Sequence, residues 1–285
     1  MIGFNHIGRL GQLGNQMFQY AGLKGIATNR GFDYIVPLHA EVVDDGIGNR
    51  LRTELFNPFN MKVDIGFIQS EKYVQEPHYE FSEDLFNNCP DDISLWGFFQ
   101  TEKYFKHIED EIRKEFTFHE DILEPCREMV DSLDSAPIFL HVRRGDPNLV
   151  DPRGFKWSYT ECSDQHPPQP LEYYEKALEL FPEDVPVVVC SDSPEWVQEQ
   201  EIFKPDRFAI SIPEDKYDDG SYEPFIDLCL MSLCSGAIIA NSTMSWWGAW
   251  LQGGRGKVVA PKMWFGPAYP NNDTKDLYPE GWTLL

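Results

Sequence analysis

The sequence predicts an α/β protein built on parallel β-sheet, and three observations lead to this prediction. Short apolar segments of strand length alternate with segments of helical periodicity throughout the second half of the chain. The first 36 residues follow the same order, with a strand, a loop, a helix and a second strand. Polar residues directly follow several of the apolar segments, as expected where parallel strands end at a ligand-binding crevice. Strands that alternate with helices pair in parallel through right-handed crossovers.

The composition is that of a folded, strongly acidic protein with one large domain or two modest ones. Hydrophobic residues make up 42% of the 285 residues and aromatic residues 14%, which is enough for substantial cores. The net charge of −23 disfavours nucleic acids and anionic membrane surfaces as partners. No apolar stretch is long enough to span a membrane, and the N-terminus lacks the pattern of a signal peptide. We therefore expect a soluble, cytoplasmic protein, with peripheral membrane association left open.

The six cysteines form no C-x-x-C pair, and three of them lie inside apolar segments. This pattern predicts free, buried thiols in a reducing compartment. Cys162 and His166 together could supply two metal ligands, whereas a structural zinc site needs four. The sequence therefore predicts no metal site.

The N-terminal elements follow in order from the first residues. Residues 2–7 predict a strand, and a loop with glycines at three-residue steps follows it. A helix with apolar residues at four-residue steps is expected to open at Asn15 and to end at Gly31. Residues 32–36 predict the next strand. The glycine spacing matches neither the dinucleotide fingerprint nor the P-loop, so a tight turn and a ligand-facing loop both remain open for it.

The middle of the chain has a weaker pattern. Residues 38–95 are polar and poorly periodic, so we expect them to be irregular. Residues 96–100 predict a short strand or turn, and the apolar positions within 104–116 are spaced as in a helix. Another helix is expected over residues 120–135.

A boundary at Ser132–Pro137 divides the chain into predicted domains of residues 1–135 and 136–285. The second domain has the more regular pattern. Its expected strands are residues 138–142, 185–190, 207–212, 237–241 and 257–261. Its expected helices are residues 171–181, a helix that Ser193 caps before Pro194, and residues 225–234 and 243–251. The loop 147–170 is long for a compact domain, and loops of this length are usually functional.

Three of these strands end in polar residues that a parallel sheet would bring to one edge. The first end is His141–Asp146 with two adjacent arginines, the second is Ser191–Ser193, and the third is Asn241–Ser245. Arginine side chains can hold phosphate oxygens in bidentate fashion. A helix start, as at the third end, also favours anions because of its N–H groups and dipole.

Each of these features also has a structural explanation. An Arg–Asp salt bridge that closes a turn would explain the first strand end, and ordinary helix capping would explain Asn241–Ser245. The tryptophans at 246, 247 and 250 are more typical of a core or domain interface than of a sugar- or base-stacking surface. Three polar ends on one sheet nevertheless favour a nucleotide site over three separate explanations.

Several segments resemble, in order, motifs of a known enzyme family. The segments are Gly11–Ala21, Gly97–Gln100, the H-x-R-R-x-D sequence His141–Asp146, the block Asp227–Cys234 with Ile238–Leu251, and Val259–Phe265. They resemble motifs of the α-1,2-fucosyltransferases, glycosyltransferase family eleven, and the H-x-R-R-x-D motif is shared with α-1,6- and protein O-fucosyltransferases. The resemblance runs over nearly the whole chain.

The resemblance implies a GT-B-like α/β fold of two Rossmann-like domains that face a cleft. Residues 1–135 would then be the acceptor-side domain, and residues 136–285 the domain that binds the GDP-sugar. The implied donor is GDP-fucose and the implied acceptor is a galactose-terminated glycan. Transfer would invert the donor linkage and form an α-linkage to the 2-hydroxyl of the galactoside.

The resemblance also assigns roles by position in the motifs. Arg143 resembles the arginine that grips the donor diphosphate, and Asp146 resembles its partner, so these two are the expected catalytic residues. Donor contacts are expected from His141, Arg143, Arg144, Asp192, Asn241, Ser242, Thr243 and Ser245, although the role of Arg144 stays open. Asn15 and Gln16 are expected to face the cleft on the acceptor side.

The chemistry of a diphosphate leaving group agrees with these roles. Such a group needs charge neutralisation more than a proton, and fixed cationic donors supply it. An arginine can replace the metal of D-x-D transferases, and the sequence contains no D-x-D, so we expect no metal or cofactor. The acceptor hydroxyl still needs a general base. Asp146 and Asp151 are the candidates, but an aspartate beside an arginine is more often an orienting partner.

The sequence thus predicts a galactoside α-1,2-fucosyltransferase. Two other hypotheses remain open, namely another nucleotide-sugar-dependent glycosyltransferase on the same fold and a non-catalytic protein that binds a sugar nucleotide or a glycan. The natural acceptor, the general base and the oligomeric state do not follow from the sequence.

Overall fold

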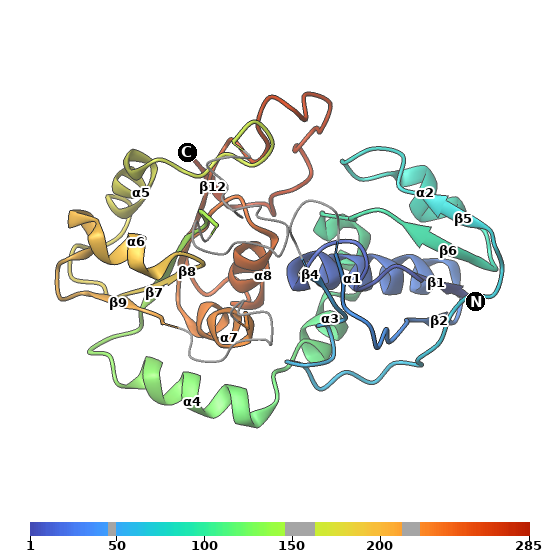
Figure 1. The fold of residues 1–285 in the computed structure, drawn as a ribbon, viewed down its shortest axis with the longest axis horizontal. Helices are drawn as coiled ribbons and strands as arrows, with labels where there is room; N and C mark the ends of the chain where they lie inside the picture. Colours follow the sequence, from blue (N-terminus) through green and yellow to red (C-terminus); the bar gives the residue numbers. More distant parts are fainter. Residues whose placement is uncertain (45–49, 146–162, 213–222) are drawn as a thin grey trace. The chain divides into compact units, whose positions relative to one another are not determined.

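Two compact units make up the computed structural model, which describes residues 1–44, 50–145, 163–212 and 223–285. The first unit comprises Met1–His119 and Asn271–Glu280, and the second comprises Glu120–Pro270 and Gly281–Leu285. Each unit contains a parallel β-sheet with helices packed beside it (Figure 1). The predicted α/β class with parallel sheets is confirmed.

The first unit contains a four-stranded parallel sheet in the order β2-β1-β6-β5. Its strands are β1 (Ile2–Gly3), β2 (Tyr34–Ile35), β5 (Tyr73–Gln75) and β6 (Ile93–Trp96). Its helices are α1 (Leu13–Arg30), α2 (Glu83–Asn88) and α3 (Glu109–Glu115), with the 3-10 turns η1 (Glu102–Tyr104) and η2 (Lys106–Ile108). A separate antiparallel pair is formed by β3 (Val43–Asp44) and β4 (Arg50–Leu51).

The segment Asn271–Glu280 joins the first unit although it lies near the end of the chain. Asp276 accepts hydrogen bonds from the Phe81 backbone N–H at 3.1 Å and from Lys103 Nζ at 2.5 Å. Lys275 Nζ lies 3.3 Å from Glu80 Oε1. The chain therefore leaves the second unit after Pro270 and returns to it at Gly281.

The second unit contains a six-stranded sheet in the order β12-β11-β10-β7-β8-β9, in which every pairing is parallel. Its strands are β7 (Ile138–Val142), β8 (Val187–Ser191), β9 (Phe208–Ile210), β10 (Ala237–Ile238), β11 (Val258–Ala260) and β12 (Thr283–Leu284). Its helices are α4 (Glu120–Asp131), α5 (Leu171–Leu178), α6 (Pro194–Glu199), α7 (Phe225–Leu233) and α8 (Thr243–Leu251), with the 3-10 turn η3 (Glu201–Phe203).

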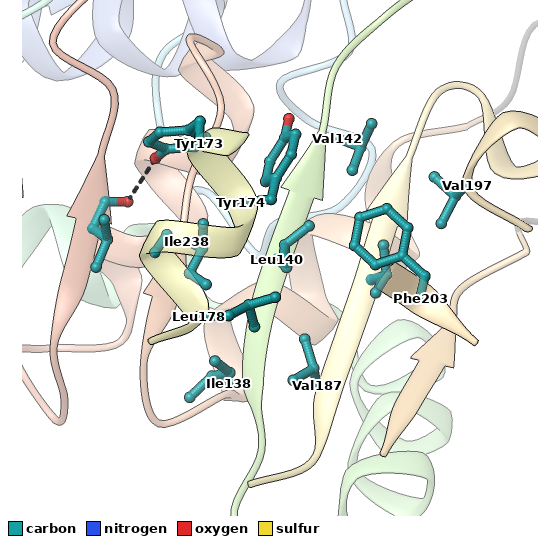
Figure 2. Close-up of a cluster of buried hydrophobic side chains, with 13 residues drawn as sticks. Ile138, Leu140, Val142, Tyr173, Tyr174, Leu178, Val187, Val197, Phe203 and Ile238 are labelled. Carbon is teal, nitrogen blue, oxygen red and sulfur yellow. Dashed lines mark hydrogen bonds between the residues drawn. The ribbon is translucent and has the colours of Figure 1, made fainter. Parts of the chain in front are cut away.

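Helices cover both faces of the second sheet, which explains why all residues of β7 and β8 are buried. Alternate residues of β7 face α5, where Tyr173, Tyr174 and Leu178 pack against the strands (Figure 2). The buried Tyr173 hydroxyl has a hydrogen-bond partner, because it donates to the Ile239 carbonyl at 2.7 Å. The other residues of β7 point to the opposite face, where α7 lies against β7 and β8. The sequence of a strand that is buried on both faces is a nearly continuous apolar run, and this pattern is what predicted β7 and β8.

The predicted elements of the second unit are found in the predicted order. The strand 138–142 and the helix 243–251 are confirmed to the residue, because each is a mostly apolar segment bounded by polar or turn residues. The strands predicted at 2–7 and 237–241 form ladders over two residues each. The segment 38–95, predicted to be irregular, also contains the short strands β3, β4 and β5 and the helix α2, each too short for its periodicity to be recognised.

The boundary between the units falls between His119 and Glu120, and not near residue 135. Helix α4 therefore belongs to the second unit, whereas the sequence pattern placed it in the first. It packs on α7, and the Cys126 thiol lies 3.8 Å from the Ile226 carbonyl that it contacts. This contact joins residues 100 apart in the sequence, so no local pattern could place the helix.

The tryptophans of α8 form part of the core, as predicted. Trp246 and Trp247 are fully buried, Trp250 is 4% exposed, and Trp246 also packs against Trp282. The five cysteines among the described residues are free and buried, as predicted, and Cys162 lies outside those residues. Within the described ranges, no helix combines the length and the apolar character needed to cross a membrane.

Candidate active site

The carboxyl edge of the second sheet brings the predicted site residues together. Arg143 follows β7 and Asp192 follows β8, and the last residues of these two strands are register partners. Asn241 follows β10 on the other side of β7. Arg143 and Asn241 each lie three residues beyond a register pair of β7 and β10. The three polar strand ends therefore meet at one edge, where open α/β sheets bind ligands.

The Asp192 carboxylate holds Arg143 and the backbone that follows it. Asp192 Oδ2 accepts hydrogen bonds from Arg143 Nη1 and from the Gly145 N–H, the latter at 2.8 Å. Asp192 Oδ1 accepts from the Arg144 N–H at 2.9 Å. The Arg143 side chain remains 20% exposed, so its guanidinium is both anchored and accessible to solvent. This ion pair joins Arg143 to an aspartate of the next strand end and orients the arginine, whereas a salt bridge to Asp146 within the turn falls outside the described residues.

The turn at Gly145 is fixed by the residues that follow β8. Gly145 has a φ of +74°, a left-handed conformation that glycine adopts without strain. Its carbonyl accepts a hydrogen bond from the Ser193 hydroxyl. Ser193 does occupy the N-cap position of α6, but its side chain makes no capping hydrogen bond there. The predicted capping by this side chain is wrong, because its hydroxyl is used across the sheet edge.

The two adjacent arginines point to different partners. The Arg144 guanidinium lies 4.0 Å from the centroid of the Trp196 ring on α6, in a cation–π contact. Trp196 in turn packs against the buried cluster of the second sheet. The role of Arg144, which the sequence left open, therefore includes packing over the Trp196 ring. Arg143 instead pairs with Asp192.

His141 lies on β7 and is 1% exposed. The pKa of its imidazole is lowered to about 3, chiefly by burial, with the Asp192 charge opposing the shift and the Arg143 charge adding to it. Its Nδ1 has no hydrogen-bond partner among the described residues. His141 is therefore neutral at physiological pH, and any contact that it makes to a ligand is that of an uncharged imidazole.

Replacement of His141 by leucine is expected to make the protein more resistant to acid. The pKa of this histidine is about 3 in the folded protein and 6.5 when unperturbed, so the unfolded chain takes up the proton first. The stability that the neutral His141 side chain contributes to the fold is fully present above pH 6.5, and it is lost as the pH falls toward the folded-state pKa. Urea midpoints measured from pH 7 to pH 4 should fall less for the variant than for wild type. The exposed His107→Leu variant is the control, and equal acid sensitivity of His141→Leu and wild type would contradict the expectation.

Helix α8 begins directly at the sheet edge. Ser242 is its N-cap in extended conformation, and its side chain makes no capping hydrogen bond. Ser242 and Thr243 are partly exposed, whereas Ser245 is fully buried and donates to the Ser242 carbonyl at 3.2 Å. A helix start leaves N–H groups without helical partners, and these attract anions. Of the predicted hydroxyl contacts, Ser242 and Thr243 are placed to meet a ligand, and Ser245 is placed to shape the helix start.

The Asn241 side chain braces the chain around the site. Its Nδ2 donates to the Pro167 carbonyl at 3.0 Å and to the Trp264 carbonyl at 3.1 Å. Its Oδ1 accepts from Gln169 Nε2 at 3.1 Å. Both ends of the amide are therefore engaged by protein groups. Asn241 connects two segments beside the sheet edge, a role that the sequence pattern did not indicate.

Asp227 is an acid near the site that sequence reasoning treated only as part of a motif. It is 4% exposed on α7, and its carboxylate accepts from the Ser211 hydroxyl at 2.6 Å. Its pKa is raised to about 7, chiefly by burial, against the hydrogen bond from Ser211 and with a smaller contribution from the Asp192 charge. The signal in the sequence was an aspartate inside a segment that is otherwise apolar on every face.

Asn15 and Gln16 differ in how they are used in the first unit. The Gln16 side chain is fully buried, donates to the Arg52 carbonyl at 2.9 Å and accepts from the Glu54 N–H at 2.9 Å. It therefore faces the interior and holds the segment Arg52–Glu54 against α1. Asn15 is partly exposed and accepts from Gln100 Nε2 at 2.7 Å. Of the two residues, Asn15 is the one that remains placed for contact with a ligand.

A second acid with a raised pKa lies at the carboxyl edge of the first sheet. Glu76 follows β5 and accepts hydrogen bonds from the N–H groups of Phe98 at 2.9 Å and Phe99 at 3.0 Å, which follow β6. Burial raises its pKa to about 7 despite these hydrogen bonds. The backbone of the Gly97–Gln100 motif is thus held in place by Glu76, which lies outside the motif.

Some predicted residues lie outside the described ranges. They are Asp146, the second expected catalytic residue, Asp151, the alternative base, and Cys162. Among the residues that the structure does describe, no three His, Cys, Asp or Glu side chains gather closely enough to hold a metal ion.

Comparisons with known proteins agree with the motif pattern. The model of glycosyl transferase family 11 matches residues 1–285. The chain is 31% identical to an O-antigen biosynthesis glycosyltransferase of Escherichia coli, over 83% of this chain and 74% of that protein. It is 27% identical to an α-1,2-colitosyltransferase of Escherichia coli, over 96% of both. It is 25% identical to galactoside α-(1,2)-fucosyltransferase 2 of Oryctolagus cuniculus, over 87% of this chain and 67% of that protein.

Solved structures show the same fold at low sequence identity. The α-1,6-fucosyltransferase NodZ, soaked with GDP-fucose, superimposes with a TM-score of 0.52 at 14% identity. The match covers 88% of this chain and 91% of that one. The fold is therefore the GT-B-like α/β fold expected from the sequence.

Proposed function

The chain belongs to glycosyltransferase family 11, and we propose that it is a galactoside α-1,2-fucosyltransferase with GDP-fucose as its donor. Membership of this family makes the protein an enzyme that transfers a sugar. What we propose beyond family membership is the nucleotide of the donor (GDP), the transferred sugar (fucose) and the linkage formed (α-1,2). Two relatives support the linkage, since one is named an α-1,2-colitosyltransferase and the other a galactoside α-(1,2)-fucosyltransferase.

One observation carries the proposal, namely the anchored Arg143 beside the start of α8. Asp192 fixes the guanidinium through Arg143 Nη1 and fixes the following turn through two backbone N–H groups. The helix start with Ser242 and Thr243 follows the neighbouring strand β10. A guanidinium and a helix N-terminus at one sheet edge form a suitable site for a diphosphate.

In the proposed reaction, the 2-hydroxyl oxygen of galactose attacks the anomeric carbon of fucose on the face opposite the diphosphate. The new C–O bond forms while the bond from that carbon to the GDP oxygen breaks, so the β-linked donor gives an α-linked product. Arg143 and the helix start stabilise the negative charge that develops on GDP. The hydroxyl proton passes to a general base, for which the sequence offers Asp146 and Asp151. No metal enters this scheme, because the arginine supplies the positive charge.

The test is incubation of the protein with GDP-fucose and lactose in the presence of EDTA. We expect release of GDP and formation of 2′-fucosyllactose with an α-linkage, identified by NMR. Activity that disappears in EDTA and returns with Mg²⁺ or Mn²⁺ would contradict metal independence. A product with another linkage would contradict the assignment of the 2-hydroxyl.

A second candidate is transfer of a related deoxysugar such as colitose. The similarity to an α-1,2-colitosyltransferase, over 96% of both chains, favours this alternative over unrelated sugars. Competition between GDP-fucose and GDP-colitose for the same acceptor separates the two candidates. Binding of either donor without turnover on any galactoside would instead support a non-catalytic binding protein.

A further inference from the structure

Three aromatic side chains of the second unit form a cluster that the proposed mechanism does not use. The ring centroid of His166 lies 5.6 Å from those of Phe265 and Tyr269, and these two lie 5.5 Å from each other. Tyr269 is 38% exposed, and the nearby Met263 is 59% exposed. The aromatic cluster of His166, Phe265 and Tyr269 therefore presents apolar surface to solvent in a strongly acidic protein.

Two chain segments are held together to build the aromatic cluster. The Gly266 N–H donates to the Gln165 carbonyl at 2.8 Å, and the Ala268 N–H donates to the Asp164 carbonyl at 2.7 Å. A side chain at Gly266 would bring its Cβ within 2.5 Å of the Asp164 carbonyl oxygen, so this close approach requires glycine. The rings are thus positioned by the backbone and not by mutual contact alone.

Asn241 attaches the aromatic cluster to the carboxyl edge of the second sheet. The two carbonyls to which it donates belong to Pro167 and Trp264, the immediate chain neighbours of His166 and Phe265. Asn241 and Arg143 occupy matching positions beyond the paired strands β10 and β7. The Arg143 charge also contributes to lowering the pKa of His166, after burial, so this imidazole lies within electrostatic range of the guanidinium and is neutral.

We propose that the aromatic cluster binds the sugar ring of the donor and selects for a 6-deoxyhexose. This inference rests on the proposed function, in which Arg143 holds the diphosphate to which that sugar is bonded. A 6-deoxyhexose carries a methyl group and an apolar C–H face, which suit aromatic rings. Glycosyl transfer develops positive charge at the anomeric carbon, so a neutral imidazole is tolerated there, whereas a charged one would be repelled. The acceptor galactose is the competing occupant, but it has no bond to the diphosphate.

The test compares binding of GDP with binding of GDP-fucose by calorimetry, in wild type and in Tyr269→Ala. We expect the affinity for GDP-fucose to fall about three- to tenfold in the variant, while the affinity for GDP changes less than twofold. Tyr269→Phe keeps the ring face and should bind GDP-fucose as wild type does. Tyr73→Ala, which removes a tyrosine that is 67% exposed in the first unit, is the matched control.

Selectivity provides a second measurement. GDP-L-galactose differs from GDP-fucose by a hydroxyl on the methyl carbon, and Tyr269→Ala and Phe265→Leu should both reduce the preference for GDP-fucose over this analogue. Unchanged GDP-fucose affinity and selectivity in both variants would overturn the inference, as would an equal loss of GDP and GDP-fucose binding. A raised KM for lactose at unchanged donor binding would assign the cluster to the acceptor and also overturn it. If wild type binds no GDP-fucose at all, the proposed function itself fails, which is a distinct result.

Discussion

Replacement of Arg143 by alanine is expected to lower kcat/KM for GDP-fucose by about 100-fold or more while the protein remains folded. The guanidinium is the charged group that the structure fixes at the sheet edge, through its ion pair with Asp192. Charge stabilisation by a preoriented donor acts mainly on the transition state, so kcat should fall more than KM rises. The side chain is partly exposed and contributes little to the core, so the urea midpoint should stay close to that of wild type.

Two further variants sharpen this experiment. Arg143→Lys keeps the charge but loses the planar fork, so we expect an activity between those of wild type and alanine. Arg127→Ala on α4 removes an arginine that is 47% exposed and pairs with surface glutamates, and it should leave activity unchanged. A folded Arg143→Ala enzyme with near-normal turnover would exclude the proposed role.

Replacement of Asp192 by alanine is expected to reduce both activity and stability. The carboxylate orients Arg143 and also accepts the N–H groups of Arg144 and Gly145, which would lose their partner. Loss of these hydrogen bonds should lower the free energy of unfolding by about 2 kcal/mol. Because Arg143 would no longer be held in place, we expect kcat/KM to fall about 10- to 100-fold.

A double-mutant cycle separates the two effects of Asp192. If Asp192 acts on catalysis through Arg143, the double variant Arg143→Ala/Asp192→Ala should be no less active than Arg143→Ala alone, although it is less stable. Asp192→Asn, which keeps an oxygen acceptor for the backbone, should retain more stability than the alanine variant. Fully additive losses of activity would show instead that Asp192 acts independently of the arginine.

The sequence predicted the parallel second sheet well because its strands are buried on both faces. Such strands appear as continuous apolar runs, and the polar residues that follow them mark the sheet edge. The meeting of Arg143, Asp192 and Asn241 followed from this rule alone. The resemblance to a known family then supplied the chemistry that this edge performs.

The individual roles of the side chains were harder to predict, because they depend on partners far away in the sequence. Ser193 donates to a carbonyl 48 residues earlier, so its hydroxyl does not cap the helix that it precedes. Gln16 is buried by backbone groups 36 to 39 residues later. Helix α1 begins at Leu13, before the expected Asn15, where the Glu54 carboxylate accepts the Leu13 N–H at 2.8 Å. Local patterns carry no information about such contacts.

The aromatic cluster illustrates the same limit. His166 and Phe265 lie about a hundred positions apart, and the described residues around each of them form no helix or strand. In the sequence, His166 drew attention only as a potential metal ligand beside Cys162, and two ligands were too few to predict a metal site. In the structure, His166 packs against the rings of Phe265 and Tyr269, and burial together with the Arg143 charge lowers its pKa. Its imidazole is therefore neutral and suited to an apolar contact.

The return of Asn271–Glu280 to the first unit has a consequence for protein engineering. A chimaera that exchanges the first unit between two enzymes cannot be made with one junction near residue 120. It must also transplant this late segment, whose Asp276 ties the Phe81 backbone and Lys103 to it. A swap with a single junction would leave those groups facing foreign side chains. Three junctions, at 119/120, 270/271 and 280/281, therefore define the exchangeable module.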